Sequence, residues 1–253
     1  MKKKVLILFG IVFVLIVLFL GIIYIMNDTR VAILGFHGVL PKELKTNDDD
    51  LIIEYDKFEK KLKILKFLGY HTMTMDEYIC WKKGECDKPH KSVLITFDDG
   101  WTNNYDYAFE LLQKYNMNAT VFYMGINAYG DGVNYLNLNL INDTKNKYKN
   151  IDFCSHSYDL HFHSDKSYEE VIEDTNKMKE VLNSNCYAYP YGDYNDNYIK
   201  ALLDSNYQIA FTFGPGKEHR KSSVKDDIMK VPRLNISNDM SDLKFIIRLI
   251  YPY

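Results

Sequence analysis

Two adjacent carboxylates, Asp98 and Asp99, follow a short apolar and β-branched run at 93–97. Such a run is typical of a buried strand. In an α/β fold, ligands and catalytic groups gather where the strands end. Successive side chains of an extended chain point to opposite faces, so one aspartate can bind a metal ion while the other acts as a base. The alternative is a strand that ends in a simple Asp-Gly turn with Gly100.

Histidines follow two further expected strands. His156 and His161 come after the run 151–154, and His37 comes directly after the run 31–36. Two histidines and one carboxylate make a set that binds a divalent metal ion and leaves positions open for water and substrate. The alternatives are a pair of solvated loop histidines and, for His37, a buried structural histidine.

The elements that must position these groups alternate between strands and helices. Apolar residues recur at helical spacing in 56–68, and capping boxes begin helices after Thr74 and Ser167. The alternation predicts a parallel α/β sheet or barrel. The Asn-rich segment 125–150 is expected to be a long loop with a short helix. Further strands are expected at 119–124, 186–189, 208–213, 228–231 and 234–236, and further helices at 105–115, 196–205 and 239–249.

The composition is that of an ordinary globular domain. The chain has 253 residues, a net charge of -3 and a pI near 6.2, with Lys and Arg spread along it, which gives no sign of nucleic-acid binding. The four cysteines contain no CxxC pair, which argues against a structural zinc cluster. Cys80 and Cys86 could close a small loop in an oxidising compartment, and reduced thiols are equally open. Cys154 and Cys186 each fall in an expected strand.

An uncharged apolar run from Val5 to Met26 follows three lysines at the N-terminus. It is long enough to cross a bilayer as a helix, and the lysines favour a cytoplasmic N-terminus. A cleaved signal peptide is the alternative, but the run ends in bulky residues without a small-residue cleavage site. We therefore expect residues 1–28 to form a cytoplasmic tip and a single-pass cell-membrane anchor. Residues 29–253 are expected to form one extracellular domain.

The motifs at three strand ends resemble those of a known family. TFDDG at 96–100, the pair His156 and His161, and YPYG at 189–192 are similar to the first three motifs of the polysaccharide deacetylases. These enzymes carry the NodB-homology domain of carbohydrate esterase family 4. The resemblance extends from about residue 31 to about residue 239. It implies a distorted (β/α) barrel, preceded here by one transmembrane helix.

The residues of the motifs are most similar to those of one branch of that family. HSYDLH at 156–161, AYPYG at 188–192 and VPRLNIS at 231–237 are similar to the biofilm poly-N-acetylglucosamine deacetylases of the intercellular-adhesion type. Carried over residue by residue, the resemblance implies that Asp98 is the general base. It also implies a divalent metal ion, usually zinc with cobalt or nickel as substitutes, held by Asp99, His156 and His161.

The third motif implies contacts with the substrate. Tyr189, Pro190 and Tyr191 would face the glycan, with the backbone N–H of Tyr191 holding the oxyanion. Many members of the family carry an arginine that orients the base where this chain has Ala188. Arg233 could replace that arginine from another strand. The alternative is that Arg233 is an ordinary surface residue.

Two further departures concern histidines. The spacing between His156 and His161 is one residue longer than in the wider family, as in the biofilm branch. The late Leu-x-His motif that usually supplies the general acid is absent, and His219 in a polar loop fits it poorly. In the biofilm branch the acid comes from an early strand, which assigns this role to His37.

The resemblance thus implies a metal-dependent hydrolase that removes N-acetyl groups from an extracellular polymer, poly-β-1,6-N-acetylglucosamine, and releases acetate. The expected partners are an N-acetylated polysaccharide and, through the N-terminal helix, a membrane. Peptidoglycan or a chitooligosaccharide is the alternative substrate. A catalytically inactive glycan-binding module that keeps the fold is the alternative function.

Overall fold

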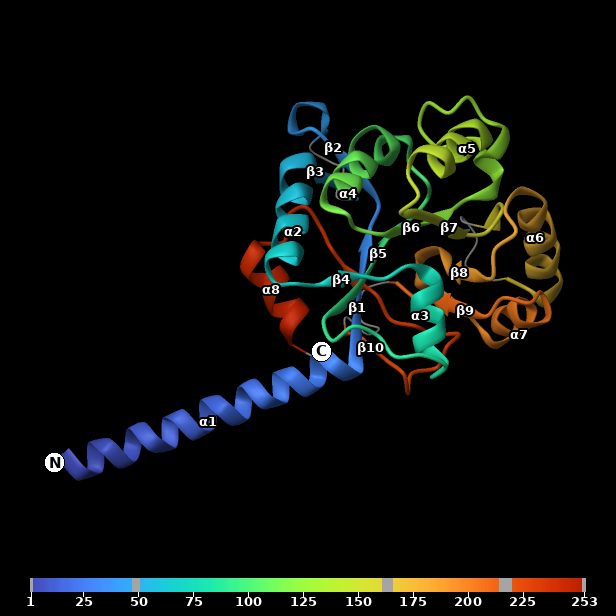
Figure 1. Ribbon diagram of the computed structural model, residues 1–253. Coiled ribbons are helices and arrows are strands. Elements are labelled where there is room, and N and C mark those ends of the chain that lie inside the picture. The colour runs from blue at the N-terminus through green and yellow to red at the C-terminus, as the bar shows by residue number, and fades with distance from the viewer. Residues whose placement is uncertain (1, 47–50, 161–165, 214–219, 252–253) are drawn as a thin grey trace.

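A computed structural model of the protein describes residues 2–46, 51–160, 166–213 and 220–251. Within these ranges a nine-stranded, mostly parallel sheet curls into a half-barrel that helices cover (Figure 1). The distorted α/β barrel expected from the sequence is therefore confirmed. The strands of the sheet are β1 (Arg30–Phe36), β4 (His71–Thr72), β5 (Ser92–Phe97), β6 (Ala119–Tyr123), β7 (Ile151–Ser155), β8 (Cys186–Ala188), β9 (Ile209–Phe211), β10 (Ser222–Ser223) and β11 (Leu234–Asn235).

The path through the sheet is β10-β1-β5-β6-β7-β8-β9, with β11 beside β1 and β4 beside β5. Among the described strands of this sheet, only β10 pairs antiparallel to its neighbour. Two short parallel strands, β2 (Gly38–Leu40) and β3 (Ile52–Glu54), form a separate pair. The helices are α1 (Lys2–Thr29), α2 (Tyr55–Phe67), α3 (Met75–Lys82), α4 (Phe109–Tyr115), α5 (Leu138–Lys147), α6 (Tyr168–Val181), α7 (Asp196–Asp204) and α8 (Asp242–Ile250), with short helical turns η1 (Lys42–Leu44), η2 (Asn104–Ala108), η3 (Gly125–Tyr129) and η5 (Pro190–Gly192).

The side chains of β5 alternate between two cores. Val93, Ile95 and Phe97 pack with α2, α4, α5 and α8 on one face, whereas Leu94 packs with α3 on the other. All four side chains are fully buried. Burial of one such side chain is worth about 1.5–3 kcal/mol, so this central strand is anchored on both faces. A third cluster joins α6 and α7 to β8 and β9.

The parallel strands deliver their last residues to one edge of the sheet. The hydrogen-bond ladder continues one residue beyond the strands on this edge. The backbone N–H of Asp98 donates to the Phe36 carbonyl, and that of His156 donates to the Tyr123 carbonyl, each at 2.9 Å. The backbone that carries these side chains is therefore held as firmly as the strands themselves.

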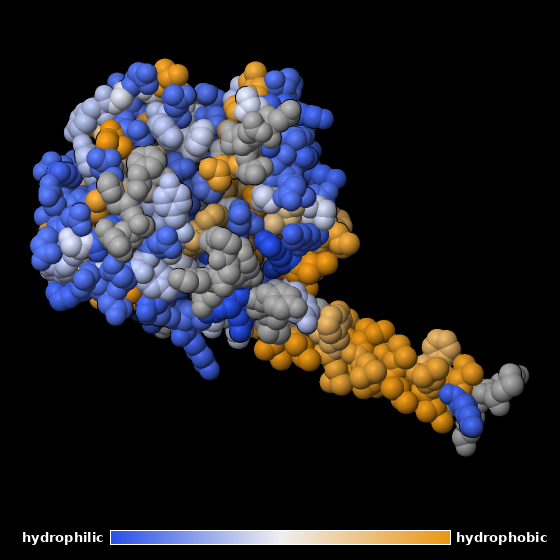
Figure 2. Space-filling view, turned by 180° about the vertical axis from the view of Figure 1, so that it is seen from behind, coloured by the Kyte–Doolittle hydropathy of each residue, from blue (hydrophilic) through white to orange (hydrophobic). Residues whose placement is uncertain are grey.

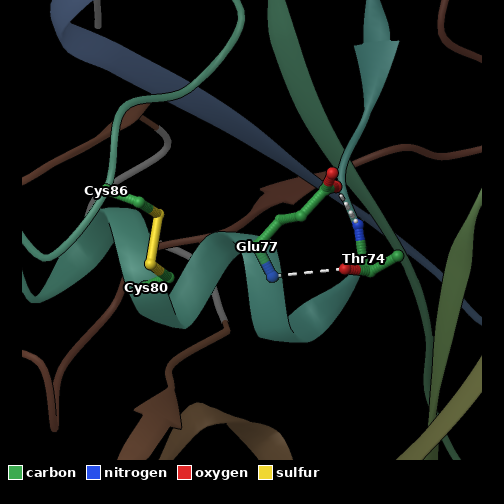
Figure 3. Close-up of a disulfide and its surroundings, with 4 residues drawn as sticks. All are labelled: Thr74, Glu77, Cys80 and Cys86. Atoms are coloured by element: carbon green, nitrogen blue, oxygen red, sulfur yellow. Dashed lines mark hydrogen bonds between the residues drawn. A yellow bond between two sulfur atoms is a disulfide. The ribbon is translucent and has the colours of Figure 1, made fainter.

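Helix α3 begins with the predicted capping box and is closed by a disulfide (Figure 3). The Thr74 hydroxyl accepts from the Glu77 N–H at 3.2 Å, and the Glu77 carboxylate accepts from the Thr74 N–H at 2.9 Å. Cys80 within the helix is bonded to Cys86 just beyond it. Of the two states left open by the sequence, the structure therefore has the bridged one. The second predicted capping box, at Ser167, is also present.

A second disulfide joins the neighbouring strands β7 and β8. Cys154 and Cys186 are both buried, and their Cα atoms lie 5.3 Å apart. Both cysteines were predicted to lie in strands, but their pairing was not predicted. The order of strands in a sheet cannot be inferred from the local sequence pattern. The bridge sits two residues before His156, so it ties together two strands whose ends reach the site.

The two disulfides are expected to differ in their effect on stability. They span sequence separations of 32 residues (Cys154–Cys186) and 6 residues (Cys80–Cys86). By loop-closure entropy, removal of the longer bridge should cost about 4 kcal/mol and removal of the shorter about 2 kcal/mol. Urea denaturation of the two double Cys→Ala variants measures this difference. An equal or larger loss for the Cys80/Cys86 variant would contradict it.

Three segments differ from the sequence expectations, and in one of them, 228–231, the structure has turns and an isolated bridge at Val231 where a strand was expected. The stretch 125–150 contains the turn η3 and the ten-residue helix α5, which Asn137 caps by accepting from the Leu140 N–H. Polar residues cover most of α5 and only Ile141 and Thr144 are buried, so its periodicity is weak. No strand was expected at 222–223, where β10 extends the sheet beyond β1.

Helix α1 extends away from the domain (Figure 1). Apolar residues cover most of the face of α1 that Figure 2 shows, and the stretch Lys4–Ile22 is not buried against the rest of the chain. These 19 residues span about 28 Å at 1.5 Å per residue, close to the thickness of a bilayer core. Among the described helices, this is the one with the length and composition to cross a membrane.

Candidate active site

Asp98 and Arg233 form a buried, two-pronged ion pair at the end of β5. The Nη1 and Nη2 atoms of Arg233 lie 2.6 and 2.9 Å from the two carboxylate oxygens of Asp98. The guanidinium lies over the rings of Phe122 and Phe213, 5.0 and 4.5 Å from their centroids, and Arg233 is 3 % exposed. The alternative of an ordinary surface arginine is therefore wrong. Both hydrogen bonds fix the plane of the Asp98 carboxylate.

His37 lies close to the same carboxylate. Its Nε2 atom is 4.0 Å from Oδ2 of Asp98. Burial raises the pKa of Asp98, but the charges of Arg233 and His156 outweigh burial, so the pKa is lowered overall. Burial lowers the pKa of His37, and the nearby carboxylates only partly oppose this. Asp98 is thus kept ionised, and a proton on His37 is more acidic than on an ordinary histidine.

Asp99 and His156 face one another beside this pair. Nε2 of His156 lies 3.5 Å from Oδ1 of Asp99, and the indole N–H of Trp101 donates to Oδ2 of Asp99 at 3.0 Å. Asp99 has a left-handed φ of 69°, which turns its side chain away from that of Asp98. Nδ1 of His156 lies 2.8 Å from the Ala188 carbonyl, which can only accept, so the proton is assigned to Nδ1. This leaves Nε2 with a lone pair directed toward Asp99.

These two donors suit a divalent metal ion. A carboxylate oxygen and an imidazole nitrogen oriented by a backbone carbonyl are common zinc ligands. Burial lowers the pKa of His156, but Asp99 and Asp98 outweigh it and raise the pKa, so the negative charge here favours a cation. The third predicted ligand, His161, lies outside the described residues, as does His219. Within the described residues no group of three potential ligands occurs.

The turn after β8 brings Tyr191 to the surface. Tyr191 has a left-handed φ of 57° and is 60 % exposed, whereas Pro190 is buried. Tyr189 requires a correction: its ring is fully buried in the cluster with α6 and α7, and its hydroxyl donates to the Met229 carbonyl at 3.0 Å. Its side chain therefore supports the turn and does not face the substrate. The strand's alternation places it on the opposite face from the site.

A cavity of about 290 Å³ opens beside His37. Its wall is mostly polar and includes Lys45, Asn235, Asn238 and Asp239. A larger cavity of about 710 Å³ is lined by the first residues of β7 and β8, at the edge of the sheet opposite to Asp98. The size of that cavity does not make it the site, because none of the candidate catalytic and metal-binding residues described above lines it.

Sequence reasoning missed two residues that contact the site. Trp101, which holds Asp99, directly follows the motif Asp98–Gly100, and this adjacency was a usable signal. Phe213, which stacks on Arg233, ends an expected strand but looks like any core aromatic. Its role depends on the position of Arg233 in the folded chain, and no local sequence pattern encodes that position.

The comparisons with known proteins agree with this geometry. Residues 85–210 match the polysaccharide deacetylase family model. Over 202 residues the chain is 33 % identical to the poly-beta-1,6-N-acetyl-D-glucosamine N-deacetylase of Staphylococcus epidermidis, covering 72 % of this chain and 67 % of that protein.

Two solved structures share the fold. The deacetylase PplD of Streptococcus pyogenes, solved in complex with acetate, has a TM-score of 0.75 and 23 % identity, covering 88 % of this chain and 99 % of that one. IcaB from Ammonifex degensii has a TM-score of 0.71 and 23 % identity, covering 87 % and 97 %. At 23 % identity these structural matches support the fold alone. The sequence match to the Staphylococcus epidermidis protein supports the family. The chain belongs to the polysaccharide deacetylase family and is a deacetylase of the hydrolase class.

Proposed function

We propose that this enzyme is a metal-dependent N-deacetylase of extracellular poly-β-1,6-N-acetylglucosamine that releases acetate. The observation that carries the proposal is the convergence of Asp98, held by Arg233, with His37 and the Asp99–His156 pair at one edge of the sheet. The activity for which the Staphylococcus epidermidis relative is named, deacetylation of poly-beta-1,6-N-acetyl-D-glucosamine, supplies the substrate class.

The residues divide the chemistry of amide hydrolysis among them. Asp99 and His156, with His161 as the predicted third ligand, would hold the metal ion, which when bound acidifies water and polarises the acetamide carbonyl. Asp98 accepts the proton of the water that attacks the carbonyl carbon. His37 gives a proton to the sugar nitrogen as the C–N bond breaks. Acetate and a free amine result, and the N–H of Tyr191 is the predicted oxyanion donor.

The cavity beside His37 supports a polymeric substrate. Its volume of about 290 Å³ is at the lower end of the range for small-ligand sites, which suits a single sugar unit. Side chains of Asn235, Ser237 and Asn238 line it, and such groups match the hydroxyls of a sugar. A sugar unit next to the reacting one can therefore be accommodated without displacing His37.

The proposed location is the outer face of the cell membrane, with α1 as the anchor. The lysines at positions 2–4 favour a cytoplasmic N-terminus, and a single crossing by α1 would then leave the domain on the opposite side. The disulfides Cys80–Cys86 and Cys154–Cys186 support an oxidising compartment, because disulfides rarely persist in the cytosol. Membrane fractionation with protease treatment of intact cells tests this. Recovery of the protein in the soluble cytoplasmic fraction would overturn it.

The substrate is tested by acetate release from three glycans at equal concentrations of N-acetylglucosamine units. We expect kcat/KM to be highest for β-1,6-linked oligomers and to rise from the monomer to the dimer and trimer as the cavity beside His37 fills. A higher value for chitooligosaccharides or peptidoglycan would keep the reaction and replace the substrate. Equal values for monomer and trimer would contradict a polymer site.

Metal binding should be visible without any substrate. The indole of Trp101 contacts Asp99, so a cation bound to Asp99 is expected to change the fluorescence of this tryptophan. We expect a saturable change on zinc addition that a chelator reverses. The Trp101→Phe variant should lose the signal while still competing with a chromogenic chelator for zinc. A signal that persists in this variant would come from Trp81, the other tryptophan, and would contradict the assignment.

A further inference from the structure

A buried carboxylate on α6 accepts hydrogen bonds from the backbone of the segment that follows His156. Asp174 is 5 % exposed. Its Oδ1 atom accepts from the N–H of Asp159 at 2.8 Å, from the N–H of Leu160 at 3.2 Å and from the Ser157 hydroxyl at 3.2 Å. Its Oδ2 atom accepts from the N–H of Tyr158 at 2.9 Å. Three consecutive backbone N–H groups therefore donate to one side chain, which belongs to a different element, helix α6.

This arrangement is a backbone nest of the kind that binds anions, with a side chain as the anion. It opens with a left-handed residue, Ser157, at φ 74°, whose hydroxyl also accepts from the Leu160 N–H at 2.7 Å. A left-handed conformation costs a non-glycine residue free energy and persists only where its surroundings enforce it. Burial raises the pKa of Asp174, and the hydrogen bonds from Asp159, Tyr158, Ser157 and Leu160 oppose this.

The chain is also held where it returns to described structure. Lys166 is buried, its ammonium lies 5.4 Å from the centroid of the Tyr198 ring, and its carbonyl accepts from the Asn195 side chain at 3.2 Å. Burial lowers the pKa of Lys166, and the charge of Asp174 only partly opposes this. The described residues before 161 and after 165 are thus both tied to the layer of α6 and α7 (Figure 1).

We propose that Asp174 is a positioning residue that fixes the chain between His156 and His161 before the metal ion arrives. The inference rests on the metal site of the proposed function. It adds a residue outside the motifs that sets the affinity of that site. Ordering the chain in advance removes part of the entropy that metal binding would otherwise have to overcome. Groups that orient metal ligands commonly change metal affinity by 10–100-fold when they are replaced.

The test compares Asp174→Asn with Glu173→Gln in the full-length protein. Asparagine keeps the shape of Asp174 but turns an N–H₂ group toward backbone N–H donors, whereas Glu173 is an exposed carboxylate on the same helix, paired with Lys177. We expect the zinc dissociation constant, measured by chelator competition, to rise 10–100-fold in Asp174→Asn and to stay within about twofold in Glu173→Gln. KM at saturating zinc should be unchanged in both variants.

If Asp174→Asn does not fold, amide hydrogen exchange of the metal-free wild type tests the proposal instead. The amides of 158–160 should be protected without zinc, because Asp174 already binds them. Free exchange of these amides until zinc is added would overturn the proposal, as would unchanged zinc affinity in a folded Asp174→Asn variant. Absence of zinc binding by the wild type would instead overturn the metal site itself.

Discussion

Replacing Asp98 with asparagine is expected to lower kcat/KM for deacetylation by a factor of about 10²–10⁴, the usual contribution of a general base. The amide keeps the shape of the side chain but cannot accept the proton from the attacking water. The zinc affinity should change little, because Asp98 is not among the predicted ligands. Acetate release at saturating zinc measures the loss. Asp106→Asn, at an exposed position on η2, is the matched control and should retain full activity.

The same variant should also be less stable, in a pH-dependent way. Arg233 stays buried without its counter-charge, which is expected to cost about 3 kcal/mol at neutral pH. The pKa of Asp98 is lowered from the ordinary value of 3.8. The stabilisation it contributes is therefore complete above that value and is lost as the pH falls through the lower native pKa. The difference in stability between wild type and Asp98→Asn should therefore narrow as the pH falls below 3.8, and a difference that does not narrow in acid would contradict this.

Replacing Gly192 with alanine is expected to disrupt the fold around the turn after β8. A Cβ atom at this position would lie 1.5 Å from the carbonyl oxygen of Phe213, which is backbone and cannot move aside as a side chain can. Gly192 also has a φ of 73°, where alanine is strained. A loss of more than about 4 kcal/mol is expected, because either the turn or the Phe213 segment that covers Arg233 must shift.

Gly69→Ala separates the steric clash from the backbone strain. Gly69 has the same φ of 73° but nothing within 4 Å of the added Cβ atom. Only the left-handed strain of about 1–2 kcal/mol is expected there. Thermal and urea denaturation of both variants measure the difference. Similar losses at the two positions would mean that Phe213 does not approach Gly192 as closely as described.

The sequence was sufficient to assemble most of the catalytic edge. Asp98, His156 and His37 could be expected to meet because each follows a run typical of a buried parallel strand, and the carboxyl ends of such strands share an edge. The helices with capping boxes were equally readable, since the signals at Thr74 and Ser167 are local. These predictions depended only on period, length and capping chemistry.

Contacts between distant segments could not be read in this way. The pairing of Arg233 with Asp98, 135 positions earlier, was expected only from the family resemblance, because no local pattern around Arg233 indicates it. Asp174 sits among other charged residues of α6, and its burial follows from tertiary packing against the segment after His156. Tyr189 was misjudged because a motif names neighbours along the chain, whereas alternation in a strand sends their side chains to opposite faces.

The most direct test of the account is acetate release from β-1,6-linked N-acetylglucosamine oligomers by the full-length enzyme after treatment with a chelator and after re-addition of zinc. We expect the chelator to abolish acetate release and zinc to restore it in the wild type, but not in an Asp99→Ala/His156→Ala variant. Acetate release that is unaffected by the chelator, or that persists in this double variant, would contradict a metal-dependent reaction at this edge of the sheet.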